Sequence, residues 1–163
     1  MKTTIPILSS MLLCISFAFP NTIIVDINGG GQFTSIQTAI LNSSAGDTIK
    51  VWPGTYNEQI TVNKNITLMG SGYENTIIIS NLSPCLTITS GKILWFLISS
   101  LADEGIRLNG GVISNCVIQG CSGNGIATNI SGGQVINCII TNNGGYGIRA
   151  DISNGTRISV INC

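Results

Sequence analysis

The sequence predicts an all-β protein built as a parallel β-helix, a solenoid of about five or six coils. Three observations predict this class. The chain repeats itself with a period of 20 to 22 residues. Each repeat holds two or three short apolar runs, none long enough for a helix of several turns. Gly and Asn stand between these runs, where the backbone has to bend.

The repeat is clearest in the C-terminal third of the chain. GGVISNCVIQGC begins at Gly110 and GGQVINCIITNN begins at Gly132, so that Cys116 and Cys138 are 22 residues apart. If these units stack as coils, each strand pairs in parallel with its copy about 4.8 Å away. A leucine-rich repeat is the alternative at this period. It needs a Leu-rich consensus, whereas the apolar positions here are mainly Ile and Val, which favours the β-helix.

The cysteines predict a packed column of reduced thiols. Cys116, Cys138 and Cys163 take the same place in successive coils, and Phe96 takes it one coil earlier. A thiol is small and apolar enough for an inward position, so we expect all three to be buried. The chain has no His and no C-x-x-C pair, so we expect no metal site and no cofactor. The residue before each of these cysteines is an Asn, which tolerates the left-handed backbone of a bend: Asn115, Asn137 and Asn162.

The charge of the chain is low and balanced. It has 7 basic and 7 acidic residues, and no basic stretch that could neutralise a row of phosphates, so nucleic acid is not an expected partner. Residues 1–20 have the pattern of a secretory signal peptide: Lys2 is followed by an apolar run too short to span a bilayer, with a cut expected after Ala18. A cleaved signal is favoured over a membrane anchor. We therefore expect one domain over 21–163, secreted or at the cell surface, without stable membrane insertion.

Residues 32–47 differ from the repeats. In the segment QFTSIQTAILNSSAGD, Ile36 and Ile40 lie four positions apart, which predicts a short amphipathic helix. Thr34 or Ser35 is the expected N-cap. The end of a β-helix exposes open strands and core, so we expect this helix to be an N-terminal cap.

Residues 24–79 resemble the opening of pectin-lyase-like β-helix proteins, particularly the pectin methylesterases. The resemblance is carried by GGGQFTSIQTAI, by GDTI ending at Ile49, by PGTYNE from Pro53, and by KNITLMG from Lys64. It implies a right-handed coil, as does the general preference for right-handed crossovers. The same opening occurs in many β-helix proteins that are not esterases, so it implies the fold more strongly than the reaction. We interpret Glu58 in this segment as a hydrogen-bond acceptor at a bend.

The resemblance also implies catalytic segments that this chain lacks. Pectin methylesterases carry Q-D-T-L, D-F-I-F-G and R-P-W segments, in which two Asp act as acid/base and nucleophile and Arg positions the substrate carboxylate. The corresponding text here, Cys116-Val-Ile-Gln-Gly120 and then Cys121-Ser-Gly-Asn, has no such pair. The His and paired Asp of polygalacturonase-like enzymes are absent. The carboxylates available for a pectate-lyase-like Ca²⁺ site, Asp103, Glu104 and Asp151, do not cluster in the repeat. We expect no catalytic residues in this chain.

Polar residues beside the repeated Gly-Ile strands form a predicted substrate-binding stripe. Its members are Arg107, Asn109, Asn129, Tyr146, Arg149 and Asp151. Arg107 and Arg149 fall in one column, two coils apart. An extended stripe on a solenoid suits an elongated glycan, so we expect a weak contact with polysaccharide. The alternative interpretation is a set of exposed charges that keeps the coil soluble.

Three functions follow, and the first is favoured. The first is a secreted or cell-surface module that contacts polysaccharide without catalysis. The second is the N-terminal fragment of a polysaccharide-acting enzyme, pectinesterase-like or pectate-lyase-like, whose catalytic coils are missing. The third is a structural or adhesive repeat segment. Cys163 falls inside a coil with no cap after it, so we expect the chain to be part of a longer protein or to dock its end on a partner.

Overall fold

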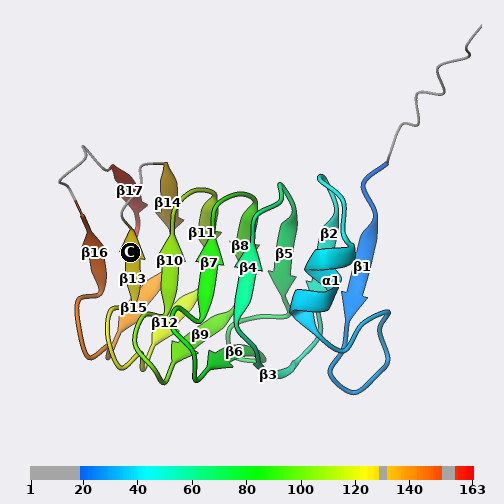
Figure 1. Cartoon of the computed structure of the whole chain (residues 1–163), viewed down its shortest axis with the longest axis horizontal. Helices are drawn as coiled ribbons and strands as arrows, with labels where there is room; N and C mark the ends of the chain where they lie inside the picture. Colours follow the sequence, from blue (N-terminus) through cyan, green and yellow to red (C-terminus); the bar gives the residue numbers. More distant parts are fainter. Residues whose placement is uncertain (1–18, 129–131, 152–156) are drawn as a thin grey trace, which may run out of the picture.

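The computed structural model describes residues 19–128, 132–151 and 157–163. These residues form a parallel β-solenoid of about six turns with one short helix (Figure 1). The predicted right-handed parallel β-helix is thereby confirmed as the fold class. Residues 1–18, which hold almost all of the predicted signal peptide, lie outside the described residues, as does Asn129. No helix among the described residues is long and apolar enough to cross a membrane.

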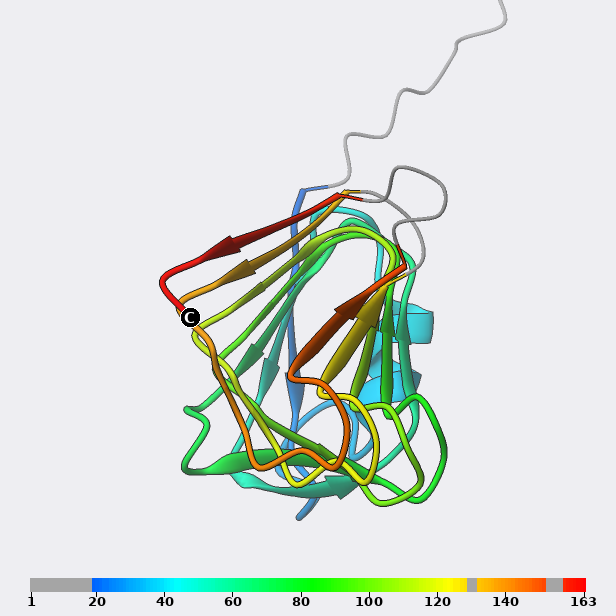
Figure 2. The ribbon, with the colours of Figure 1, turned by 90° about the vertical axis from the view of Figure 1, so that its left-hand side faces the viewer.

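Three parallel sheets make the three sides of the solenoid (Figure 2). Sheet 1 contains β1 (Thr22–Val25), β2 (Thr48–Val51), β5 (Thr67–Gly70), β8 (Lys92–Leu94), β11 (Val112–Ser114), β14 (Gly133–Ile136) and β17 (Ile158–Ile161). Sheet 2 contains β3 (Gly54–Asn57), β6 (Thr76–Ser80), β9 (Leu97–Ser100), β12 (Val117–Gln119) and β15 (Ile139–Thr141). Sheet 3 contains β4 (Ile60–Val62), β7 (Leu86–Ile88), β10 (Ile106–Leu108), β13 (Ile126–Thr128) and β16 (Ile148–Ala150). From β2 onward, each coil visits the sheets in the order 1, 2, 3.

The core is a set of in-register columns of branched side chains. In sheet 1 the column contains Ile49, Leu68, Ile93, Ile113 and Val135, all fully buried. Residues on either side of these positions point outward, because successive side chains of a strand alternate between its faces. Burying one such side chain contributes about 1.5–3 kcal/mol, so stacking the coils supplies the stability that a single coil lacks.

The predicted column at the corner between sheets 1 and 2 is confirmed. The pairing of β9, β12 and β15 places Phe96, Cys116 and Cys138 at equivalent positions, and all three are buried. Cys163 follows in register after β17, but its predicted burial is wrong: it is exposed, because it lies on the outermost coil of the structure. The preceding residues have the left-handed backbone expected of them, with φ of 52° at Asn115, 51° at Asn137 and 52° at Asn162.

The predicted cap is the helix α1 (Ile36–Asn42). Ser35 is its N-cap and its hydroxyl accepts a hydrogen bond from the Thr38 N–H at 3.1 Å, while Ile36 and Ile40 are buried. The helix stands in the row of β4, β7 and β10, where a strand of the first coil would otherwise lie (Figure 1). The Gln37 side-chain oxygen accepts a hydrogen bond from the Thr61 N–H of β4 at 2.7 Å. The helix therefore covers the edge of sheet 3.

Two side chains from the opening segments, Glu58 and Lys64, hold the two ends of α1. Glu58 accepts hydrogen bonds at the N-terminus from the Ser35 hydroxyl at 2.8 Å and from the Ile36 and Gln37 N–H groups, both at 2.9 Å. The ammonium of Lys64 donates to three carbonyls at the C-terminus, those of Ile40, Leu41 and Ser43, at 2.7–2.9 Å. A carboxylate at the N-terminus and a cation at the C-terminus both match the helix dipole. Glu58 is thus an acceptor as expected, but for the helix rather than for a bend.

Candidate functional site

Three of the predicted stripe residues line one depression on the outer face of sheet 3. This depression has a volume of about 330 Å³ and is lined by Glu104, Arg107, Ala127, Thr128, Arg149 and Asp151. Arg107, Arg149 and Asp151 were predicted from the sequence. The other three were not, although Ala127 and Thr128 occupy the repeat positions between them.

The two arginines of the depression project from two strands of sheet 3. Register pairs Arg107 of β10 with Ala127 of β13, and Ala127 with Arg149 of β16, which confirms the predicted column. Neighbouring strands lie about 4.8 Å apart, so the two arginine backbones are about 10 Å apart. The methyl group of Ala127 between them leaves space above the middle strand. This space separates the two positive groups.

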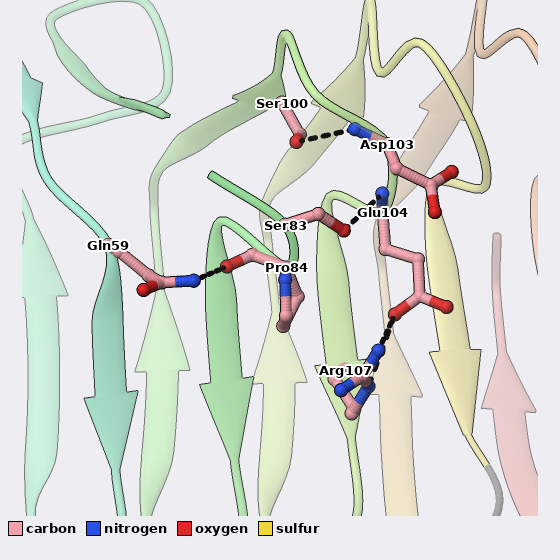
Figure 3. A network of polar contacts seen from close by, with 7 residues as sticks. All are labelled: Gln59, Ser83, Pro84, Ser100, Asp103, Glu104 and Arg107. Carbon is pink, nitrogen blue, oxygen red and sulfur yellow. Dashed lines mark hydrogen bonds and ion pairs between the residues drawn. The ribbon is translucent and has the colours of Figure 1, made fainter. Parts of the chain in front are cut away.

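An ion pair orients the first arginine. Both Nε and Nη2 of Arg107 donate to the Oε2 atom of Glu104, at 3.1 and 2.7 Å. Figure 3 shows the Glu104 side chain extending along the strand toward Arg107, and its backbone N–H donates to the Ser83 hydroxyl at 3.1 Å. Because the Arg107 side chain is 43% exposed, the pair contributes less than about 1 kcal/mol to stability.

The second arginine differs from the first in its partners. Among the residues that the structure describes, no side chain pairs with the Arg149 guanidinium, and Arg149 is exposed. Asp151 follows it after β16, and its backbone N–H donates to the Thr128 carbonyl at 2.9 Å. The depression therefore has a neutralised cation at Arg107, an exposed cation at Arg149 and the carboxylate of Asp151.

The remaining predicted stripe residues lie elsewhere. Tyr146 is 69% exposed and lines a second shallow depression with Ile148, Arg149 and Ala150. Asn109 lies after β10, and its Oδ1 atom is buried without a hydrogen-bond partner in the described part of the chain. Asn129 is outside the described residues. The stripe is thus divided into two depressions that share Arg149, and Asn109 lines neither of them.

Two carboxylates near the depression, those of Glu104 and Asp103, point at other residues of the solenoid. The Glu104 carboxylate is engaged by Arg107, and the Asp103 side chain points toward the next coil (Figure 3). A Cβ atom at Gly123 would overlap the Asp103 carboxylate, so the segment after Cys121 has no room there for a second carboxylate. No three metal-binding side chains come together within the described ranges.

Two of the buried thiols, Cys85 and Cys116, are poor candidates for a nucleophile. Burial, with a smaller effect of the neighbouring Cys121, raises the pKa of Cys85 to about 12. Burial also raises the pKa of Cys116. A thiol that stays protonated at neutral pH is a poor nucleophile. The hydrogen bond with the Cys116 side chain lowers the pKa of Cys138 to about 7, but Cys138 lies at the corner between sheets 1 and 2 and does not line the depression.

Comparison with solved structures finds the same fold in one group of enzymes. The chain has the fold of pectin methylesterases. It is similar to the pectin methylesterase from carrot, with a TM-score of 0.62 and 17% identity, covering 89% of this chain and 62% of that one. It is similar to the pectin methylesterase PemA from Erwinia chrysanthemi, with a TM-score of 0.53 and 13% identity over 76% of this chain and 55% of that one.

A third similar structure is a pectin methylesterase mutant in complex with hexasaccharide IV. Its TM-score is 0.59 at 15% identity, covering 88% of this chain and 67% of that one. No family model and no curated protein matches the sequence. The chain thus spans less than two thirds of the carrot and Erwinia pectin methylesterases, and what it shares with all three enzymes is the fold.

Proposed function

We propose that this chain is a secreted or cell-surface β-helix module that binds an acidic polysaccharide and does not catalyse its breakdown. The observation that carries the proposal is the depression on sheet 3, where Arg107 and Arg149 project from one column on either side of Ala127. The pectin methylesterase fold supports polysaccharide as the ligand class.

The exposed guanidinium of Arg149 favours a carboxylated glycan over a neutral one, in a lining that also contains the carboxylates of Glu104 and Asp151. A guanidinium binds a carboxylate through two parallel hydrogen bonds, and Arg149 is exposed and able to do so. Glu104 holds Arg107 along the strand, so the guanidinium of Arg107 is oriented before ligand arrives. The open and shallow shape fits a chain that lies along the surface. Binding is expected to be weak and to fall as salt is added, because both arginines are solvent-exposed.

The test is binding of polygalacturonate by affinity electrophoresis and calorimetry. Arg149→Ala is expected to weaken binding by roughly tenfold, since a charge-assisted hydrogen bond contributes about 1.5–3 kcal/mol. The matched control is Lys92→Ala, which removes an exposed cation from sheet 1 and should leave binding unchanged. Double-stranded DNA should not bind, and equal binding of DNA would mean unspecific attraction of polyanions. Absence of binding to polygalacturonate at low salt would refute the proposal.

The second candidate is the N-terminal portion of a polysaccharide-acting enzyme, pectinesterase-like or pectate-lyase-like. The observation that favours it is length, because the chain spans 62% and 55% of the carrot and Erwinia enzymes. Methanol release from methyl-esterified pectin, or unsaturated ends from polygalacturonate, would establish this candidate and contradict the non-catalytic one. If neither binding nor turnover is found, the structural or adhesive segment remains.

A further inference from the structure

Three exposed aromatic residues stand at one corner of the solenoid, away from the depression. Trp52 follows β2, Tyr73 lies between β5 and β6, and Trp95 follows β8. Their exposed fractions are 45%, 39% and 41%. The strands β2, β5 and β8 are neighbours in sheet 1, and β3, β6 and β9 are neighbours in sheet 2. The turns that join them are therefore stacked in three successive coils. We call these three residues the aromatic corner; it includes both tryptophans of the chain.

The backbone of Trp95 is strained. Its φ is 65°, in the left-handed region that a bulky side chain rarely adopts. In the next coils, register places Asn115 and Asn137 at the same position, where Asn tolerates this conformation. In the preceding coil the chain has Gly70, and a Cβ atom there would overlap the Trp95 carbonyl. Burial does not explain the tryptophan either, because its side chain remains 41% exposed. A strained and exposed aromatic residue is a mark of a functional surface.

The other two aromatic residues are held by their own turns. The buried hydroxyl of Tyr56 donates a hydrogen bond to the Trp52 carbonyl at 3.0 Å and accepts one from the Ile27 N–H at 3.2 Å. A Cβ atom on Gly30 would lie 3.4 Å from the Trp52 ring, so this glycine lets the loop approach the indole. More than half of the Trp52 surface is therefore covered by the protein, and the rest faces solvent.

The turn of Tyr73 is equally well fixed. The Ser71 hydroxyl donates to the Val51 carbonyl of the coil before at 2.8 Å, and the Ser71 N–H donates to the Thr76 hydroxyl at 2.9 Å. The Asn75 carbonyl accepts from the Gly54 N–H at 2.8 Å, which ties this turn to that of Trp52. Little conformational entropy would be lost on binding, since all three aromatic residues lie on ordered turns.

In the coils after Trp95, asparagine residues occupy the equivalent position at the same corner. Asn115, Asn137 and Asn162 follow at one-coil intervals, and the Asn162 side-chain amide donates to the Asn137 oxygen at 3.2 Å. These side chains carry no charge, and each offers both donors and an acceptor. Aromatic faces beside uncharged amides match a sugar ring, which has an apolar C–H face and a rim of hydroxyl groups.

From this arrangement we infer a second polysaccharide-binding surface, in which the aromatic corner and the adjoining asparagines bind a neutral glycan chain. The rings stack on sugar faces and the amides bind hydroxyl groups. This surface lies between sheets 1 and 2, whereas the arginine depression lies on sheet 3, so the inference does not depend on the proposed function.

The test uses the fluorescence of the two tryptophans, which both report on this corner. The probes are soluble neutral glycans: cellohexaose, galactan, arabinan and glucomannan. At least one is expected to shift or quench the emission and to bind in calorimetry, with the same affinity at low and high salt because no charge takes part.

The decisive variant is Trp95→Asn, which installs the residue that later coils have at this position. It should fold and should weaken neutral-glycan binding by roughly tenfold, while polygalacturonate binding is retained. The matched control is Leu101→Ala, an exposed apolar residue outside the corner and outside both depressions, which should have no effect. The inference is overturned if none of the four glycans changes the emission, if Trp95→Asn binds as well as the unchanged protein, or if the corner instead mediates concentration-dependent self-association that Trp95→Asn abolishes.

Discussion

The first coil and the later coils are stabilised in different ways. In the first coil, α1 is fixed by directed polar contacts: Glu58 holds its N-terminus, Lys64 holds its C-terminus, and Gln37 ties it to β4. In the later coils the main contacts are backbone pairing and columns of apolar side chains, with glycines where neighbouring coils approach closely. The end coil of a solenoid has a neighbouring coil on one side only. Specific side chains must therefore make the stabilising contacts that a neighbouring coil makes elsewhere.

This difference teaches how to interpret the opening segments. The P-G-x-Y-x-E and K-N-I-T motifs supply Glu58, Lys64 and the buried Tyr56, all of which hold the first coil together. They are therefore a signature of a capped β-helix and carry no information about a reaction. The surfaces free for function are the outer faces and corners of the later coils.

The largest expected loss of stability comes from a substitution in the column of glycines formed by Gly105, Gly125 and Gly147 in the later coils. A Cβ atom at Gly105 would lie 2.5 Å from the Cys121 sulfur and 2.7 Å from the Gly125 carbonyl oxygen. Gly105→Ala is therefore expected to destabilise the protein by about 2–3 kcal/mol, because backbone of the next coil has to move. Chemical denaturation monitored by circular dichroism measures the change.

Gly147 gives a matched control in the same column. The pairing of β10, β13 and β16 makes Gly147 the equivalent of Gly105, but among the described residues a Cβ atom there would approach only the Ile140 methyl group, at 3.4 Å. Gly147→Ala should cost less than about 1 kcal/mol. Equal losses for the two variants would mean that coil-to-coil packing does not limit this column.

An intermediate effect is expected at the cap. Glu58→Ala removes the acceptor of three hydrogen bonds at the start of α1 and should cost about 2 kcal/mol. Hydrogen exchange should show that protection of backbone amides is lost first in α1 and β4. The control Glu74→Ala removes an exposed carboxylate and should change stability by less than about 0.5 kcal/mol. Uniform loss across all coils would contradict a local role of Glu58 in the cap.

The smallest effect is a dependence on pH at the first coil. Hydrogen bonds from the Asn21 and Ser44 N–H groups, at 2.8 and 2.7 Å, lower the pKa of Asp47 below 3.8. Its stabilising contribution is therefore present above pH 3.8 and is lost as pH falls through the lowered folded-state pKa. Asp47→Asn should lower the melting temperature at pH 7, and the difference from the unchanged protein should shrink below pH 3.8. A difference that is constant with pH would disprove this role.

The sequence predicted the fold better than the site, and the reason is periodicity. The 22-residue spacing of Cys116 and Cys138, and the place of Phe96 one coil earlier, follow from repetition and are confirmed by the strand register. The same repetition predicted the shared column of Arg107 and Arg149. Contacts that occur once could not be predicted in this way. The pairing of Glu104 with Arg107 depends on side-chain direction. The strain at Trp95 follows from its backbone φ of 65°, which the sequence alone does not reveal.

The hydrogen bond made by the Gln37 side chain affects how copies of this protein can associate. The outermost strand of sheet 3 at this end presents an N–H group that another chain could use to add a strand of its own. That donor is occupied by the Gln37 oxygen, and the helix stands across the approach. Addition of a foreign strand to this edge of sheet 3 is thereby hindered, and two copies of the molecule cannot join through it without displacing the helix.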